Sequence, residues 1–169
     1  MRNEDIRLRN SLNVGSHLPV LMKLFSITDG PIVEYGGGIN STIFFHWACF
    51  STERKLLTLE SDWINHKLLR KFRTDWHQCQ FVRHWNDAIV EDNYSLVFID
   101  HNPAAQRHVD VKKHINAEYV VLHDSEPDKN NIYFYDRIYP LFKYKLDYTK
   151  SWPNTTILSN VHRLNKLKI

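Results

Sequence analysis

Three consecutive glycines, Gly36, Gly37 and Gly38, constrain the fold of this chain more than any other feature of its sequence. The short β-branched run Ile32–Tyr35 precedes them, and an amphipathic segment that opens with Ser41 and Thr42 follows. Glycine lets the chain turn sharply and lets a ligand approach the backbone. Ser41 or Thr42 can cap a helix whose free N–H groups then face that ligand. The pattern predicts a strand, a tight turn and a helix, although three glycines can also form a plain loop.

A second nearly continuous apolar run, 55–60, ends in the carboxylate of Glu60. Such runs are typical of buried parallel strands. Glu60 follows the glycines at about the 20-residue spacing at which nucleotide-binding folds place the residue that binds the ribose hydroxyls. Ser61 then opens the next helical segment. The sequence therefore predicts a ribose-binding carboxylate, the alternative being a capping or surface glutamate.

The segment from Glu34 to Gly38 has the form acidic residue, any residue, Gly, any residue, Gly. It resembles the first motif of the class I S-adenosylmethionine-dependent methyltransferases, and the resemblance extends from about His17 to Asn160. It implies an α/β protein with a three-layer Rossmann-like methyltransferase fold. The sheet would be mostly parallel, in the order 3-2-1-4-5-7-6, with helices on both faces. The whole chain, 1–169, would be one domain with a lead-in segment at 1–16, helical around Glu4–Leu12.

The resemblance also implies which residues bind S-adenosylmethionine. The glycine turn, the carboxylate after the second strand and the segment after the third strand contribute most of them. The third strand is expected at 78–83, and Trp85 and Asp87 after it lie where the family contacts adenine, although packed surface residues are an equal alternative. The expected set is Glu34, Gly36, Gly37, Gly38, Ser41, Thr42, Glu60, Ser61, Trp85, Asp87 and Asp100.

Two further predicted strands, 94–100 and 117–122, deliver carboxylates at their C-terminal ends, Asp100 within the first and Asp124 just after the second. Open α/β sheets bind ligands at the carboxyl ends of their strands. The candidate catalytic residues are therefore Asp100, His101, His123 and Asp124. Either histidine can act as the base for a hydroxyl acceptor, whereas a lone histidine is more often structural. Arg107 and His108 can bind an anionic acceptor or lie exposed on a helix.

Asp100 and Asp124 also suggest a metal. The catechol-type O-methyltransferases, a branch of the same family, hold Mg²⁺ with an Asp after the fourth strand and an Asp-Asn pair after the fifth. Asp100 and Asp124 match the two aspartates, while Ser125 replaces the asparagine. Oxygen ligands of this kind suit Mg²⁺. The resemblance therefore implies a Mg²⁺ site at this pair, although Ser125 departs from the family's pattern.

The remaining pattern completes the predicted sheet and helices. Helices are expected at 17–26, 41–50, 61–72, 101–115 and 131–141, and the last two strands at 144–148 and 155–159. A net charge of +3 with both signs interspersed does not favour a nucleic-acid partner, despite the basic ending 162–168. The sequence has no apolar run long enough for a membrane span and no signal peptide, so a cytoplasmic protein is expected. Cys49 and Cys79 are expected to be reduced core thiols.

These features predict an S-adenosylmethionine-dependent methyltransferase that acts on an oxygen of a small-molecule or sugar-like acceptor. One alternative is a non-catalytic domain of the same fold that binds the cofactor or a partner protein. Another is an NAD-linked oxidoreductase, which Ser41 disfavours because dinucleotide folds usually have Gly or Ala as the third residue of this motif. Many aromatic residues and an open-edged sheet make a homodimer a reasonable expectation.

Overall fold

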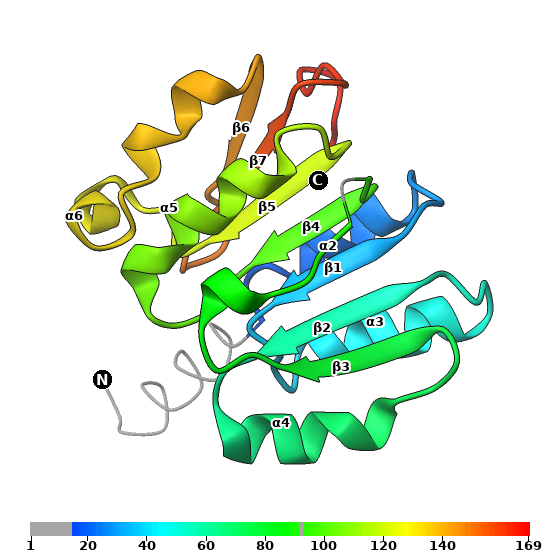
Figure 1. Cartoon of the computed structure of the whole chain (residues 1–169). Coiled ribbons are helices and arrows are strands. Elements are labelled where there is room, and N and C mark those ends of the chain that lie inside the picture. The colour runs from blue at the N-terminus through cyan, green and yellow to red at the C-terminus, as the bar shows by residue number, and fades with distance from the viewer. Residues whose placement is uncertain (1–14, 92) are drawn as a thin grey trace, which may run out of the picture.

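The computed structural model describes residues 15–91 and 93–169, in which one seven-stranded sheet lies between two layers of helices (Figure 1). The strand order is β3-β2-β1-β4-β5-β7-β6, which confirms the predicted order. The five strands β3, β2, β1, β4 and β5 pair in parallel in that order, and β7 runs antiparallel between β5 and β6. The strands are β1 (Ile32–Tyr35), β2 (Leu56–Glu60), β3 (His77–Phe81), β4 (Leu96–Ile99), β5 (Tyr119–His123), β6 (Tyr144–Tyr148) and β7 (Thr155–Ser159).

Helices α2 (Leu18–Phe25) and α3 (Ser41–Phe50) cover one face of the sheet, and α5 (Arg107–Asp110) covers the other (Figure 1). Helix α4 (Trp63–Leu69) lies beside the edge strand β3, and Asp62 caps it by accepting a hydrogen bond of 2.8 Å from the N–H of Asn65. Short 3-10 turns extend α4 and α5 or connect other elements: 70–72, 85–87, 104–106, 111–114, 127–129, 135–137 and 139–141.

The core has two layers, and strand β4 shows how residues divide between them. Leu96 and Phe98 pack with the buried residues of α2 and α3, whereas Val97 and Ile99 pack on the α5 side. This alternation follows from the two-residue period of a strand. The same alternation continues for the first residues after a strand, so whether their numbers are odd or even predicts which face of the sheet their side chains lie on.

The prediction of one continuous helix at 131–141 is wrong, because the observed α-helix is much shorter. Helix α6 covers only Asn130–Tyr133, and two separate 3-10 turns follow it. Phe134 has a positive φ of 54°, and a residue in the left-handed region ends an α-helix. The predicted helix around Glu4–Leu12 lies outside the described residues.

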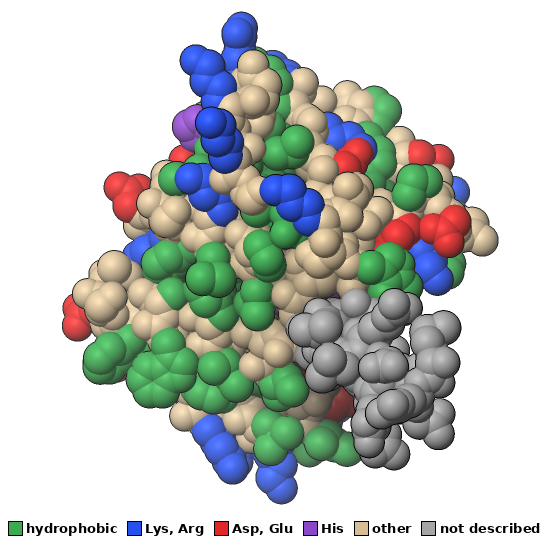
Figure 2. Space-filling model, turned by 180° about the vertical axis from the view of Figure 1, so that it is seen from behind, with side chains coloured by type: hydrophobic (Ala, Val, Ile, Leu, Met, Phe, Trp, Pro, Cys, Tyr) green, Lys and Arg blue, Asp and Glu red, His purple; other side chains and the backbone are tan. Residues whose placement is uncertain are grey.

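The outer surface of α2 and α3 carries several exposed apolar side chains, and Figure 2 shows apolar residues gathered on this side of the molecule. Met22, Trp47 and Phe50 are more than half exposed. Cys49 and Cys79 are buried, free thiols, as expected. In residues 15–91 and 93–169, every helix is too short or too polar to cross a membrane.

Candidate functional site

A cleft of about 590 Å³ opens at the carboxyl ends of β1, β2 and β4. The glycine turn after β1, Glu60 at the end of β2 and Asp100 after β4 all line it. This is the edge at which open α/β sheets bind ligands. The full lining is His17, Gly36, Gly37, Gly38, Asn40, Ser41, Glu60, Ser61, Asp62, Asn65, Asp100, His101, Asn102 and Pro103.

The three glycines of the turn have different surroundings. Gly36 has φ of 85°, and a Cβ placed on it would lie 2.6 Å from the Cα of His101. A Cβ on Gly37 would lie 2.2 Å from a methyl carbon of Leu69. A Cβ on Gly38 would meet only Ser41 Oγ, at 3.8 Å. The fold therefore requires glycine at position 36, where a Cβ would meet backbone atoms, whereas a Cβ at position 37 would have to displace the Leu69 side chain. Gly38 keeps its side open toward the cleft.

A buried hydrogen-bonded chain fixes the conformation of this turn. The hydroxyls of Thr42 and Thr58 donate to Glu34 Oε2 at 2.7 and 2.8 Å, and Thr42 Oγ1 accepts from the N–H of Gly38 at 2.9 Å. Glu34 is fully buried. It is therefore a positioning residue beneath the turn. Neither Ser41 nor Thr42 caps α3, since both lie in its first turn after Asn40.

Glu60 presents a carboxylate to the cleft from the end of β2. Its Oε1 accepts the N–H of Asp62 at 2.6 Å, and only 6% of the residue is exposed. Burial raises the pKa of this carboxyl, although the backbone N–H groups of Asp62 and Ser61 act in the opposite direction. The carboxylate is thus held in one orientation with its charge facing the cleft.

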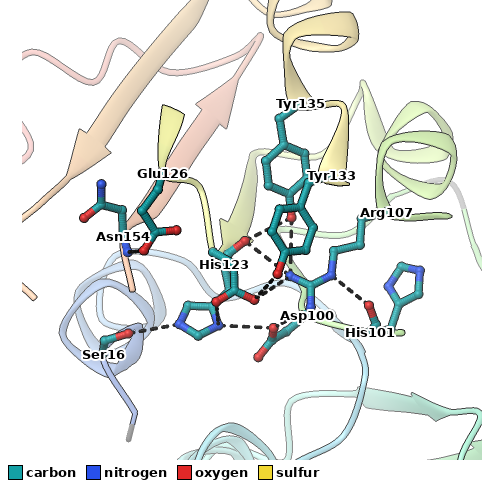
Figure 3. A network of polar contacts seen from close by, with 10 residues as sticks. Ser16, Asp100, His101, Arg107, His123, Glu126, Tyr133, Tyr135 and Asn154 are labelled. Atoms are coloured by element: carbon teal, nitrogen blue, oxygen red, sulfur yellow. Dashed lines mark hydrogen bonds and ion pairs between the residues drawn. The ribbon is translucent and has the colours of Figure 1, made fainter. Parts of the chain in front are cut away.

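Asp100 and His123 form a hydrogen-bonded pair beside the cleft. His123 Nδ1 donates to Asp100 Oδ1 at 3.1 Å, which leaves Nε2 directed at the hydroxyl of Ser16, 2.9 Å away (Figure 3). Burial raises the pKa of Asp100, but the hydrogen bond and charge of His123, together with Arg107, bring it below its ordinary value. Burial lowers the pKa of His123, but Asp100 outweighs burial and raises it above 6.5. The carboxylate thus orients the imidazole and increases its basicity.

Arg107 lies at the centre of this network and is only 3% exposed (Figure 3). Its guanidinium contacts Asp100 Oδ1 at 3.0 Å and Asp124 Oδ2 at 3.1 Å. It also donates to the carbonyl oxygens of His101, at 2.7 Å, and His123, at 3.3 Å. One buried cation therefore joins the loops after β4 and β5, and its charge is already neutralised by two carboxylates.

Solved structures with the same fold place this geometry among known proteins. A putative O-methyltransferase from Klebsiella pneumoniae superposes with a TM-score of 0.64 at 16% identity, over 89% of this chain and 80% of the other. An O-methyltransferase from Bacillus cereus, in complex with SAH, gives a TM-score of 0.60 at 13% identity, over 92% and 89%. A spermidine synthase from Thermotoga maritima gives 0.55 at 15% identity, over 82% and 55%. No family model and no curated protein matches the sequence.

The chain has the Rossmann-like fold of class I methyltransferases. Identities this low establish the fold alone. The same fold also occurs in a spermidine synthase, so the fold by itself does not decide which group is transferred.

Within this methyltransferase fold, several predicted residues meet at the cleft and others do not. The side chain of His101 is 1% exposed, packs on Trp85 at 4.1 Å between ring centroids, and pairs with Asp110 at 3.0 Å. Its backbone borders the cleft, but its imidazole faces the α5 layer because it shares strand parity with Ile99. The prediction that His101 acts as a catalytic base is therefore corrected to a structural role.

The two residues predicted to contact adenine do not line the cleft. Trp85 is 5% exposed, and its indole N–H donates to the carbonyl of Asn102 at 2.7 Å, so it supports the loop after β4 from within. Asp87 is exposed on the short turn 85–87 and is absent from the cleft lining. The tight turn after β3 directs Trp85 into the core, which the sequence pattern could not indicate.

The pair Asp100 and Asp124 does not fit the predicted Mg²⁺ site. The guanidinium of Arg107 contacts both carboxylates and supplies the positive charge that a shared cation would bring. Asp124 also accepts a hydrogen bond from Tyr133 at 3.1 Å. Asp124 is thus an anchor for Arg107, and we derive no step through a metal at this pair.

The residues present do fit S-adenosylmethionine. Gly38 leaves space for a ligand against the backbone, and Glu60 offers a carboxylate to hydroxyl donors. Five polar residues of the lining were not predicted from the sequence: His17, Asn40, Asp62, Asn65 and Asn102. Asp62 and Asn65 lie beside the recognised Ser61, so the helix start after β2 was a usable signal. His17 directly precedes α2, and no pattern in the sequence joins it to β4.

The buried carboxyl of Glu34 predicts a pH-dependent stability. Burial raises its pKa from 4.5 to about 7, so between these values the folded protein keeps a proton that the unfolded chain releases. Stability therefore falls as the pH rises through this window, by about 3 kcal/mol for a shift of this size. Glu34→Gln should lack that fall, because glutamine can still accept from Thr42 and Thr58 without titrating. Urea unfolding of the parent protein and of Glu34→Gln at pH 5 and pH 8 measures the change in the free energy of unfolding. An equal change in both proteins would contradict a raised pKa of Glu34.

Proposed function

We propose that the protein is an S-adenosylmethionine-dependent methyltransferase that methylates an oxygen of a small-molecule or sugar-like acceptor. The observation that carries the proposal is one cleft that is lined by the glycine turn, by Glu60 and, at its β4 side, by Asp100, which is hydrogen-bonded to His123 beside the cleft. The glycine turn and Glu60 suit a nucleoside, and Asp100 and His123 suit removal of a proton from an acceptor.

Gly38, Ser41 and Glu60 would hold the cofactor, with Glu60 accepting hydrogen bonds from the ribose hydroxyls. Glu34 and Thr42 act on it indirectly, because they fix the turn through the N–H of Gly38. Bound S-adenosylmethionine supplies a methyl group on a sulfonium, which is already an activated electrophile. The protein must therefore orient the acceptor and accept its proton.

His123 is the residue proposed to accept that proton. Asp100 keeps the hydrogen on Nδ1, so the lone pair of Nε2 is available as a base. The buried hydroxyl of Ser16 lies 2.9 Å from Nε2, so an acceptor hydroxyl would have to take the place of Ser16 to reach this base. Arg107 fixes Asp100 and, being fully paired, is not proposed to bind an anionic acceptor.

Removing the Glu60 carboxylate tests the cofactor assignment. Glu60→Ala should weaken S-adenosylmethionine binding by about 1–3 kcal/mol, because the ribose hydroxyls lose their acceptor in a partly buried site. Isothermal titration measures the affinity. Asp75→Ala is the matched control, since it removes one carboxylate from an exposed residue just before β3, at the opposite edge of the sheet. An equal loss in both variants, or none in Glu60→Ala, would refute the ribose assignment.

The Asp100–His123 pair predicts a specific pH dependence. A neutral His123 is the reactive form, so the methyl-transfer rate should rise with pH through the raised pKa of this imidazole. Asp100→Asn should lower that pKa and shift the rise to lower pH, while reducing the rate by about 10²-fold or more. Asp124→Asn is the comparison, because it retains the hydrogen bond from His123 to Asp100 and removes only the smaller effect of Asp124 on the pKa of His123, so its shift should be smaller. Unchanged pH profiles in Asp100→Asn would remove the pair from the mechanism.

A non-catalytic cofactor-binding domain is the alternative function. It predicts the same Glu60 result without turnover, so the pH-rate experiment separates the two. The expected homodimer and the cytoplasmic location stay predictions. The exposed apolar surface of α2 and α3 is where a second copy would have apolar area to cover.

A further inference from the structure

His17 is a buried imidazole whose hydrogen-bonding groups are unused. The residue is 4% exposed, and both ring nitrogens are buried without a hydrogen-bond partner among the described residues. Leaving a buried polar group unpaired costs free energy, so native proteins rarely do so without a reason. The ring lines the cleft, and its nearest aromatic neighbours are His123, at 4.7 Å between ring centroids, and Phe98, at 4.8 Å. An additional ligand at this point would satisfy one of the unused nitrogens.

Three potential ligand atoms converge here from three separate elements. His17 comes from the start of α2, Asp100 follows β4 and His123 ends β5. One ligand atom from each lies within 4.8 Å of the other two. Strand parity explains the convergence, because Asp100 and His123 fall on the same face as Phe98 and Val121, the face that α2 covers.

We propose that His17, Asp100 and His123 form a binding site for a divalent transition-metal ion such as Zn²⁺. Two imidazoles and one carboxylate are a ligand set that Zn²⁺ accepts, with a further position left for water or a substrate atom. This site differs in its ligands from the Asp100–Asp124 pair considered above, and its existence does not depend on the proposed enzymatic activity.

The geometry needs only small adjustments. Ligand atoms of a tetrahedral zinc site lie about 3.4 Å apart, so side-chain movements of about an ångström would bring these three atoms to that separation. The ion pair and the hydrogen bond of Asp100 both use Oδ1, so Oδ2 is available to the ion while Arg107 stays in place. Asp100, Asp124 and Arg107 together carry one net negative charge, which favours a dication over an anion at this point.

Binding of the ion would change the role of His123. Whichever nitrogen of His123 coordinates the ion, the other carries the ring hydrogen, so the coordinated imidazole has no free lone pair and the ion and the base function exclude each other. If the proposed function holds, Zn²⁺ should inhibit methyl transfer; if that function fails, the metal site is still measurable by itself.

The direct test is titration of chelator-treated full-length protein with Zn²⁺, followed by Co²⁺ in place of Zn²⁺. We expect micromolar or tighter 1:1 binding of Zn²⁺ and intense visible d–d bands of low-coordinate Co²⁺ that Zn²⁺ abolishes. Paramagnetically shifted N–H resonances of two histidines in the Co²⁺ protein would identify the imidazoles without any substitution. Binding weaker than millimolar, or Co²⁺ spectra typical of a hexa-aqua ion, would overturn the proposal.

Substitutions assign the ligands. His17→Phe and Asp100→Asn should each weaken Zn²⁺ binding by at least tenfold, with the fold checked by circular dichroism. His46→Phe is the matched control, because His46 is also largely buried but lies on α3 outside the cluster, and it should bind as tightly as the parent. If His17→Phe does not fold, His17→Gln replaces it. Equal affinity in folded His17 variants and the control would overturn the assignment.

Discussion

Replacing Gly36 by alanine is expected to destabilise the folded protein by about 3 kcal/mol. The positive φ of 85° costs an L-residue about 1–2 kcal/mol, and a Cβ at 2.6 Å from the backbone of His101 adds overpacking of about 1–3 kcal/mol. The clash is with backbone atoms rather than a flexible side chain, so it cannot be relieved by a rotamer change. Urea unfolding followed by circular dichroism measures the loss.

Gly38→Ala is the matched control for this prediction. Its added Cβ meets only Ser41 Oγ at an ordinary 3.8 Å, so the free energy of unfolding should change by less than about 1 kcal/mol. The methyl group would lie at the cleft, however, and should weaken S-adenosylmethionine binding. Equal destabilisation by the two alanines would contradict the distinct roles given to these glycines.

Replacing Arg107 by methionine is expected to cost about 3–5 kcal/mol of stability, the usual loss when one partner of a buried ion pair is removed. Asp100 and Asp124 would then lie close together without their shared cation, and the carbonyl oxygens of His101 and His123 would lose a donor. Arg107→Lys should rescue only part of this loss, because one ammonium cannot reproduce the planar, multidentate contacts.

Arg137→Met provides the control for the Arg107 prediction. Arg137 is exposed and stacks on Phe134 at 4.3 Å, so its removal should cost less than about 1 kcal/mol. Thermal and urea unfolding of the three variants measure the differences. A loss below 1 kcal/mol in Arg107→Met would show that the buried network contributes little to the loops after β4 and β5.

Much of the fold could be predicted because its signals are local. Apolar runs ending in Glu60 or Asp100 identify buried parallel strands, and the glycine turn fixes the order of strand, turn and helix. The sheet order came from the family resemblance rather than from the residues themselves. The helix predicted at 131–141 failed because one residue, Phe134, adopts a left-handed backbone conformation that nothing in its type requires.

The site was harder to predict because side-chain direction depends on packing. Asp100 and His101 are adjacent in sequence, yet one faces the cleft and the other faces Asp110. Strand parity was the signal available for separating them. Two features had no sequence signal: the burial of Arg107 between two aspartates, and the contact of His17, at the start of α2, with His123 at the end of β5.

The central claim is that the cleft binds S-adenosylmethionine, and isothermal titration of the purified protein tests it most directly. We predict micromolar binding of S-adenosylmethionine and S-adenosylhomocysteine, and no binding of NAD at the same concentrations. Repeating the titrations with Glu60→Ala links any affinity to the cleft. Failure of both sulfur-containing ligands to bind, or binding of NAD instead, would contradict the account.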